Sequence, residues 1–254
     1  MKNDEYWEFS LKVNIDKLDQ INYIKERLKK PLKEARGVVT TICSQESVLL
    51  LVGVNMAYKL RIKGIVCSLI ANIVSTIYKR EYITRKFNFV VKHDLMYKSF
   101  LKALISFDSD VDRQIIYNKL ICFDNIVLQS FVDFKLRDLK RKWNELIMLA
   151  NDNYMYLLSG GNFLELLKFL LSNLECKVDK VCVKKNQNGK YVFLFTNNYT
   201  SLNSFEFPKS AEDVVTSLID LCPNKITIIN QNDFSKEITD FLSELFGAKI
   251  EIIE

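Results

Sequence analysis

The sequence predicts an α+β (or α/β) fold, and three observations support this. Of 254 residues, 48% are hydrophobic and 26% are charged, as in folded proteins with a sizeable core. Seven Gly and three Pro are too few for a sandwich or barrel built from many tight turns. The apolar residues recur with a period of two, then with helical spacing, then with a period of two again. We therefore expect three parts, residues 1–54, 55–174 and 175–254, packed as one compact unit.

The first part is expected to be a small β-α-β-β lobe. Apolar and polar residues alternate in "YWEFSLKVNI", which indicates a half-buried strand. A helical pattern follows, and Pro31 is expected to end or bend that helix near Lys30 because proline lacks the backbone N–H. Two β-branched runs on either side of the turn-like "SQES" then predict two further strands.

The second part is expected to be helical. Its predicted helices lie at about 55–88, 94–106, 110–122, 125–151 and 162–174. The most apolar run, residues 64–78, is shorter than the ~20 residues needed to cross a membrane, and it contains Ser and Asn. We interpret this run as a helix buried within the protein.

The third part is expected to have the order β-β-α-β-α-β. Two β-branched segments flank "NQNG", in which Asn188 and Gly189 can adopt the positive φ angles of a tight hairpin turn. Ser210 is expected to cap the following helix, and Gly247 is expected to end the last one. The remaining segments, "KITIINQ" and "AKIEIIE", predict two strands.

The charges are distributed unevenly along the chain. Residues 56–102 contain ten Lys or Arg against two acids, whereas residues 203–254 contain four Lys against ten acids. Such segregation suggests parts that have different partners or that attract each other. The N-terminal residues show no apolar signal segment, so we expect a cytoplasmic protein whose six cysteines are reduced.

Two basic segments are candidate binding surfaces for nucleic acid or an anionic membrane. The predicted helix at 125–151 carries cations beside an apolar stripe, and residues 56–102 mix cations with Tyr. Either could equally be an ordinary solvated face, with acid–base pairs such as Asp133–Arg137 one turn apart. The candidate binding residues are Lys79, Arg80, Arg85, Lys86, Lys135, Arg137, Lys140 and Arg141.

Other motifs favour no catalytic, cofactor or metal site. The "DSDVDR" segment lacks the Gly and Glu that an EF-hand calcium loop requires, so its aspartates are expected at a turn and a helix start. The "LSGGN" segment is not followed by a phosphate-binding lysine motif and is interpreted as a turn between helices. His93 is the only histidine, which excludes sites with several imidazoles. We infer no small-molecule substrate.

The chain resembles the YtxC-like family of sporulation proteins from endospore-forming Firmicutes. The segment "SFVDFKLRDLKRKWNELIMLANDNY" is similar to the family's "GF-x-x-FRLKDY" helix. Phe131, Phe134, Arg137 and Asp138 occupy matching positions, and Lys135 replaces the usual Arg. The similarity is clearest over residues 126–195, it extends to the closing α-β-α-β pattern of the tail, and it is looser over residues 64–90. The "LSGGN" segment departs from the family's pattern.

This resemblance implies a sporulation-associated cytoplasmic protein and carries over no reaction, cofactor or catalytic residue. Our first hypothesis is a non-enzymatic protein that acts by contact with another macromolecule, for which a protein partner is the favoured choice. The alternatives are an electrostatic binder of nucleic acid or membrane, and an enzyme with a site assembled between lobes. The resemblance also marks Phe131, Phe134, Arg137 and Asp138 as motif residues, for which a structural ion pair against a neighbouring helix is the simplest role.

Overall fold

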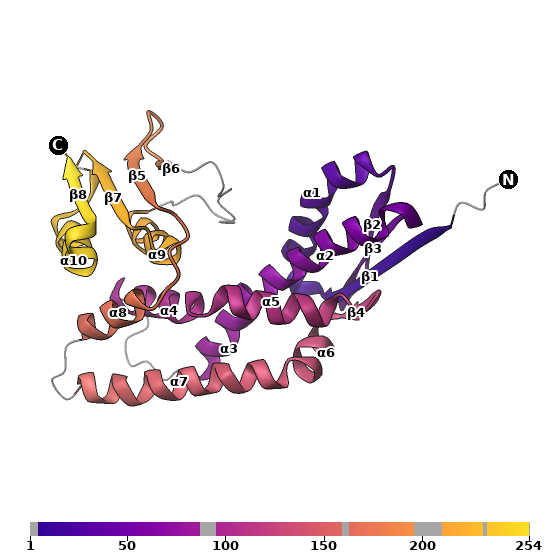
Figure 1. The fold of residues 1–254 in the computed structure, drawn as a ribbon, viewed down its shortest axis with the longest axis horizontal. Coiled ribbons are helices and arrows are strands. Elements are labelled where there is room, and N and C mark those ends of the chain that lie inside the picture. Colours follow the sequence, from indigo (N-terminus) through magenta and orange to yellow (C-terminus); the bar gives the residue numbers. More distant parts are fainter. Residues whose placement is uncertain (1–4, 87–94, 159–162, 196–209, 231–232, 254) are drawn as a thin grey trace. The chain divides into compact units, whose positions relative to one another are not determined.

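The computed structural model describes residues 5–86, 95–158, 163–195, 210–230 and 233–253, which form two compact units (Figure 1). Unit 1 comprises Met1–Arg85 and Ser109–Glu145, and unit 2 comprises Lys86–Asp108 and Leu146–Glu254. Each unit contains a four-stranded mixed sheet with helices. The predicted α+β class is confirmed.

The two units divide the chain differently from the three expected parts. The region 55–174, expected to be a single helical part, supplies helices to both units. Helix α4 (Leu95–Ser106) belongs to unit 2, and helix α5 (Ser109–Leu120) belongs to unit 1. The reason is tertiary: α5 packs against the core helix of unit 1, whereas α4 packs against helices from the C-terminal part of the chain.

The sheet of unit 1 contains the expected β-α-β-β lobe and one strand from much later in the chain. Strand β3 (Ser47–Asn55) pairs antiparallel with both β1 (Tyr6–Asn14) and β2 (Val38–Cys43). Strand β4 (Asn125–Val127) pairs parallel with β1, which gives the order β2-β3-β1-β4. Strand β4 lies within a predicted helix, because three residues are too few to show a period of two.

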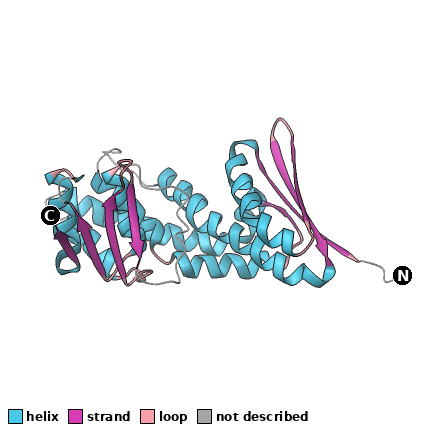
Figure 2. Cartoon of the chain, turned by 90° about the horizontal axis from the view of Figure 1, so that it is seen from above, coloured by secondary structure: helices cyan, strands magenta, loops and turns pink. Residues whose placement is uncertain are grey.

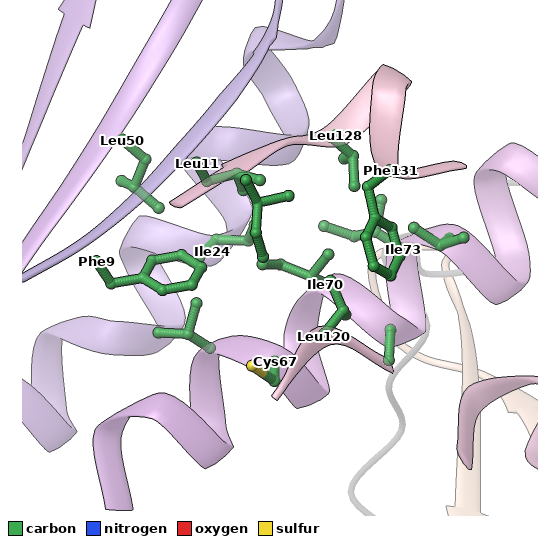
Figure 3. Packing of buried hydrophobic residues seen from close by; sticks show 14 of the residues in the cluster. Phe9, Leu11, Ile24, Leu50, Cys67, Ile70, Ile73, Leu120, Leu128 and Phe131 are labelled. Atoms are coloured by element: carbon green, nitrogen blue, oxygen red, sulfur yellow. The ribbon is translucent and has the colours of Figure 1, made fainter. Parts of the chain in front are cut away.

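One face of this sheet forms the core of unit 1. Helices α1 (Leu18–Glu34) and α2 (Lys59–Ile73) lie on one side of this sheet (Figure 2). Alternate residues of β1 and β3, such as Phe9 and Leu50, belong to the core on that side (Figure 3). Ile24 and Ile70 meet them from these two helices and are fully buried. The alternation explains the burial, because successive side chains of a strand point to opposite faces.

The first helix does not end near Lys30, which was one of the two alternatives expected there. Helix α1 continues through Pro31 to Glu34. Pro31 lies in the last turn and cannot donate to the carbonyl oxygen four residues earlier, but its own carbonyl oxygen still accepts from the amide of Ala35 at 3.1 Å. The buried side chains Leu28 and Leu32 hold the chain on the sheet on both sides of the proline.

A long helical stretch begins with a 3₁₀ turn (Met56–Tyr58) and runs through α2, a π-helical turn η3 (Val74–Tyr78) and helix α3 (Lys79–Lys86). Within the described residues, Met56–Lys86 is the one helix long and apolar enough to cross a membrane, and 50% of its most apolar window is buried inside the protein. A helix buried in the core of a protein can meet the same criteria of length and hydropathy. Ile62, Val66 and Ile70 are fully buried in the unit 1 core, as expected for residues 64–78.

The single helix predicted at 125–151 is wrong in its first third. After β4 the chain makes a short turn, α6 (Leu128–Ser130), and a π-helical turn, η4 (Phe131–Lys135). Leu136 then leaves helical geometry at φ −106° and ψ 25°, and helix α7 (Arg137–Leu158) begins. The apolar residues keep a helical spacing across the break at Leu136, so the periodicity of the sequence alone could not reveal the break.

Unit 2 has the predicted β-β-α-β-α-β order after its helices α4 and α8 (Phe163–Ser172). The hairpin β5 (Lys180–Lys185) and β6 (Tyr191–Phe195) is followed by β7 (Lys225–Ile229) and β8 (Ile250–Ile253), in the order β6-β5-β7-β8. Helix α9 (Ala211–Leu221) lies between β6 and β7 in the chain, and helix α10 (Lys236–Phe246) connects the parallel strands β7 and β8.

The predicted hairpin turn at Gly189 and the caps of unit 2 are confirmed, but Asn188 does not have the positive φ angle expected for it. Ser210 caps α9 in a capping box with Asp213. Gly189 has φ +72° in the hairpin turn, and Gly247 has φ +53° at the end of α10. These conformations favour glycine because it has no Cβ to clash with the backbone.

Candidate interaction surface at the start of helix α7

The motif residues lie on the π-helical turn η4 and on the first turn of α7. The buried side chains of Phe131, Val132 and Leu136 anchor this segment in the core of unit 1. Phe134 lies on the opposite side and is 63% exposed. A π-helical turn costs hydrogen-bond geometry and occurs often at functional sites. The segment therefore presents an exposed aromatic ring on a firmly anchored support.

One cation contacts this exposed ring, and two more lie on neighbouring groups. The guanidinium of Arg137 lies 5.5 Å from the centroid of the Phe134 ring. The ammonium group of Lys135 lies 5.5 Å from the Phe123 ring, and Lys119 donates to the Lys135 carbonyl oxygen at 2.8 Å. Exposed cation–π contacts stabilise by about 0.5–1 kcal/mol, enough to orient a side chain. We call Phe134, Lys135, Arg137, Asp138 and Arg141 the Phe134 surface.

The ion pairs here differ from those suggested by helical spacing. Asp133 accepts hydrogen bonds from Lys140 at 2.5 Å and Gln129 at 2.7 Å, and Asp138 pairs with Arg141 at 3.4 Å. The expected Asp133–Arg137 pair does not form because the break at Leu136 changes the helical phase between the two residues. Arg137 and Asp138 are both exposed, so the expected structural ion pair against a neighbouring helix is also absent from the described residues.

Lys79 is not a surface residue, contrary to its expected place on a basic face. Its side chain is 1% exposed and its ammonium group lies 2.7 Å from Oδ2 of Asp112. Arg80, Arg85 and Lys86, the other candidates on α3, are exposed. Arg85 lies 3.7 Å from Glu81.

The two basic segments meet in unit 1. The hydroxyl of Tyr82 on α3 donates to Oδ1 of Asn144 on α7 at 2.8 Å, and Lys140 lies 5.9 Å from the Tyr82 ring centroid. The hydrogen bond from Lys140 holds the pKa of Asp133 below its ordinary value, against partial burial, and Gln129 and the charge of Arg85 add to this. Helices α3 and α7 therefore share one electrostatic environment.

Acids far away in the sequence neutralise much of the basic region 56–102. Lys63 donates to Asp124 at 2.5 Å, with Lys59 also near that carboxylate at 3.7 Å, and Arg61 pairs with Glu34 at 2.5 Å. Partial burial opposes ionisation of Asp124, but the ammonium groups of Lys63 and Lys59 hold its pKa below its ordinary value. Counting charges within one segment missed these acids.

In unit 2, basic residues of α4 pair with acids of α9. Lys98 lies 2.5 Å from Glu212, and Lys102 lies 3.2 Å from Asp220. Lys177 and the hydroxyl of Ser106 also contact Asp220, at 3.2 and 2.6 Å. Part of the charge segregation along the chain thus corresponds to attraction between segments of unit 2, one of the two explanations suggested by the sequence.

Two sequence motifs lie wholly or mainly outside the described residues: His93, and residues 159–162 of "LSGGN". Of the "DSDVDR" aspartates, Asp108 has φ +53° before α5, Asp110 pairs with Arg113, and Asp112 is buried. Among the described residues, no group of three His, Cys, Asp or Glu side chains is placed to hold a metal ion.

Comparison with protein-family models matches residues 62–251 to the YtxC-like family. The match covers the helices of unit 1 from within α2 onwards, the Phe134 surface, and almost all of unit 2. Strands β1, β2 and β3 precede the matched residues. No curated protein and no solved structure matches the chain.

Proposed function

The chain belongs to the YtxC-like family, and from this membership we propose that it is a sporulation-associated cytoplasmic protein that acts by contact with another protein rather than by catalysis. The family's association with endospore formation supports the biological setting. The Phe134 surface supports the mode of action, because it lies within the matched residues and contains three of the four motif residues, Phe134, Arg137 and Asp138.

The observation that carries this proposal is the exposure of Phe134. Its partner in the motif, Phe131, is 6% exposed and serves the core, whereas Phe134 is 63% exposed and is held by Arg137 alone among the described contacts of its ring. Aromatic residues and Arg are the side chains most enriched in the energetic centres of protein interfaces. An exposed aromatic–arginine pair on an anchored turn fits that role.

The electrostatics around the Phe134 surface also favour contact over proton transfer. A general acid or base works best with a pKa near the operating pH. Asp133, the carboxylate beneath this surface, has its pKa lowered by Lys140 and is therefore held ionised. Asp124 is held ionised in the same way by Lys63 and Lys59. Both carboxylates are suited to structural pairing.

Spore formation tests the proposal. In the source organism, a deletion strain would be complemented with the wild-type gene, with Phe134→Ala/Arg137→Ala, or with Phe169→Ala, which removes an exposed ring from α8 in unit 2. We expect heat-resistant spore counts to fall only with the double variant, at unchanged protein level. Cross-linking in sporulating cells should capture a protein partner that the double variant loses. Wild-type behaviour of the double variant in both assays contradicts the proposal.

A second candidate function, binding of a polyanion, is favoured by the exposed cations on α3 and at the start of α7. Arg80, Arg85 and Lys86 lie on the first, and Lys135, Arg137 and Arg141 on the second. Nearby acids reduce the net positive charge of this region, since Glu81 lies near Arg85 and Asp138 pairs with Arg141. Polyanion binding releases counterions, so its affinity falls steeply as salt rises.

Fluorescence anisotropy of labelled duplex DNA at several salt concentrations tests this candidate. Charge reversal with Arg80→Glu/Arg85→Glu should weaken binding and reduce its salt dependence. Reversal of two exposed lysines of α1, Lys30→Glu/Lys33→Glu, serves as the matched control. Lys79 is not reversed, because its burial would confound binding with unfolding. The same titration with anionic and neutral lipid vesicles tests a membrane. No binding at low salt contradicts this candidate.

A further inference from the structure

We propose that the chain forms a two-fold dimer in which strand β2 pairs antiparallel with β2 of a second copy, so that the two N-terminal sheets become one continuous sheet. The proposal concerns an edge that lies before the family-matched residues, and it is independent of the Phe134 surface.

Strand β2 is the edge of its sheet, and among the described strands it pairs with β3 alone. The amide of Ser44 donates to the carbonyl oxygen of Ser47 at 2.8 Å and closes the hairpin. In an antiparallel ladder, alternate residues direct their backbone groups to the partner strand. Counting back from Ser44 in this register, Val39, Thr41 and Cys43 direct their N–H and C=O groups towards the open edge.

This edge lacks the features that normally prevent strand addition. Natural edge strands carry charges, proline or bulges. Strand β2 has the sequence VVTTIC, without charge, proline or glycine, and five of its six residues are β-branched. Val38 and Ile42 are 69% and 55% exposed, on the face of the sheet opposite α1 and α2. An uncharged, β-branched edge is well suited to accept another strand.

The charges that flank β2 favour a second copy as the occupant. Arg36 precedes the strand and Glu46 follows it in the hairpin turn. Both are exposed, and neither side chain has an ion-pair or hydrogen-bond partner among the described residues. Antiparallel self-pairing brings Arg36 of each copy to the Glu46 end of the other, whereas parallel pairing brings like charges together. Antiparallel pairing also satisfies the self-complementarity of a two-fold interface.

The backbone pattern selects the register. For the ladder to form, residues whose backbone N–H and C=O groups face the open edge must lie opposite one another in the two copies. The two-fold axis at Thr41 meets this condition, with Val39 opposite Cys43 of the copy. In that register Arg36 aligns with Glu46 of the copy at both ends of the interface. A shift that moves the axis to Thr40 keeps the ladder but aligns Arg36 with Ser44, so the ionic contacts favour Thr41 as the centre.

Light scattering of the full chain after size exclusion, over a range of concentrations and in reducing buffer, tests the dimer. We expect a mass of twice 29.7 kDa that dissociates on dilution. Ile42→Lys should give the monomer, because an edge lysine blocks strand addition. Val127→Lys, at an exposed apolar position on the opposite edge strand, is the control and should leave the dimer intact. Circular dichroism must show that both variants remain folded.

Charge exchange tests the register. Arg36→Glu and Glu46→Arg should each weaken the dimer about 10-fold, since each replaces two symmetric attractions with two repulsions. The double variant restores opposite charges and should return the dissociation constant to within about 2-fold of wild type. A monomer at every concentration overturns the dimer, as does a dimer that Val127→Lys disrupts and Ile42→Lys does not. Additive weakening in the double variant overturns the register.

Discussion

The ammonium group of Lys79 lies 2.7 Å from Oδ2 of Asp112, and the two side chains are only 1% and 4% exposed. The indole Nε1 of Trp143 donates to the same oxygen at 2.9 Å. These contacts join α3, α5 and α7 in unit 1. A buried ion pair contributes little net stability compared with apolar residues of similar volume, but it makes each partner indispensable to the other.

Replacing Lys79 alone is expected to destabilise unit 1 strongly. Lys79→Met leaves the Asp112 carboxylate buried without its cation, which costs about 3–5 kcal/mol. Arg80→Met, at the exposed neighbouring position, should change the free energy of unfolding by less than about 0.5 kcal/mol. Urea denaturation of the purified variants measures both.

The double variant Lys79→Met/Asp112→Asn separates a lost ion pair from lost packing. Its amide oxygen can still accept from Trp143, and no unpaired charge remains, so much of the stability should return. A double variant as unstable as Lys79→Met would show that the packing of the lysine stem, not the charge, is what matters.

The two phenylalanines of the motif are expected to have opposite roles. Phe131→Ala empties a buried site and should cost about 3–5 kcal/mol of folding stability. Phe134→Ala removes an exposed ring and should change stability by less than about 0.5 kcal/mol. Thermal and urea unfolding measure the difference. A large loss of stability in Phe134→Ala would argue that this ring supports the fold.

Asp220 is expected to make unit 2 sensitive to acid. Burial opposes its ionisation, but Lys102, Lys177 and the Ser106 hydroxyl outweigh burial and hold the pKa of Asp220 below its ordinary value of 3.8. The unfolded chain therefore binds a proton at a higher pH than the folded chain does. The stability from Asp220 is fully present above the unfolded pKa and is lost as pH falls below it towards the lower folded pKa.

Urea midpoints measured between about pH 6 and pH 3 test this linkage. Asp220→Asn should be less stable than wild type at neutral pH, and the difference should shrink as the pH falls. Ser106→Ala removes one hydrogen-bond donor to the carboxylate and should show part of the effect. Parallel pH profiles for wild type and Asp220→Asn would refute the assignment.

Cysteine labelling tests the burial of the core helix α2. Burial raises the pKa of the Cys67 thiol from 9.0 to about 11, which lowers its thiolate fraction about 100-fold at neutral pH. Cys43, Cys122 and Cys176 are exposed. Iodoacetamide followed by peptide mapping should therefore modify these three well before Cys67 in the native protein. In urea, Cys67 should react as fast as they do; rapid native labelling would show that α2 is not in the core.

Local patterns in the sequence predicted most elements of the two sheets. The alternation around Trp7 and Phe9, the turn at Gly189 and the Ser210 cap all depend on neighbouring residues, and their predictions are confirmed. Pro31 was misjudged because burial of Leu28 and Leu32 in the tertiary structure outweighs a local helix-breaking tendency near the helix end.

The candidate surface was predicted only in part. Sequence similarity marked Phe131, Phe134, Arg137 and Asp138, but helical spacing could not tell which phenylalanine is exposed or that η4 interrupts the helix. The burial of Lys79 was also missed, because its acid, Asp112, lies 33 residues away in a different helix. A charge count along the chain cannot include such a partner.

By itself, the sequence determined the α+β class, the order of strands and helices at the two ends of the chain, and the similarity to the YtxC-like family. These follow from side-chain periodicity, turn and cap chemistry, and motif spacing, which all act over short distances along the chain. Only the tertiary structure decided that β4 joins β1, that Lys79 is neutralised in the core while Phe134 is exposed, and that β2 is a sheet edge. Each of these depends on which distant segments pack together, because burial and pairing are properties of the whole unit rather than of its local sequence.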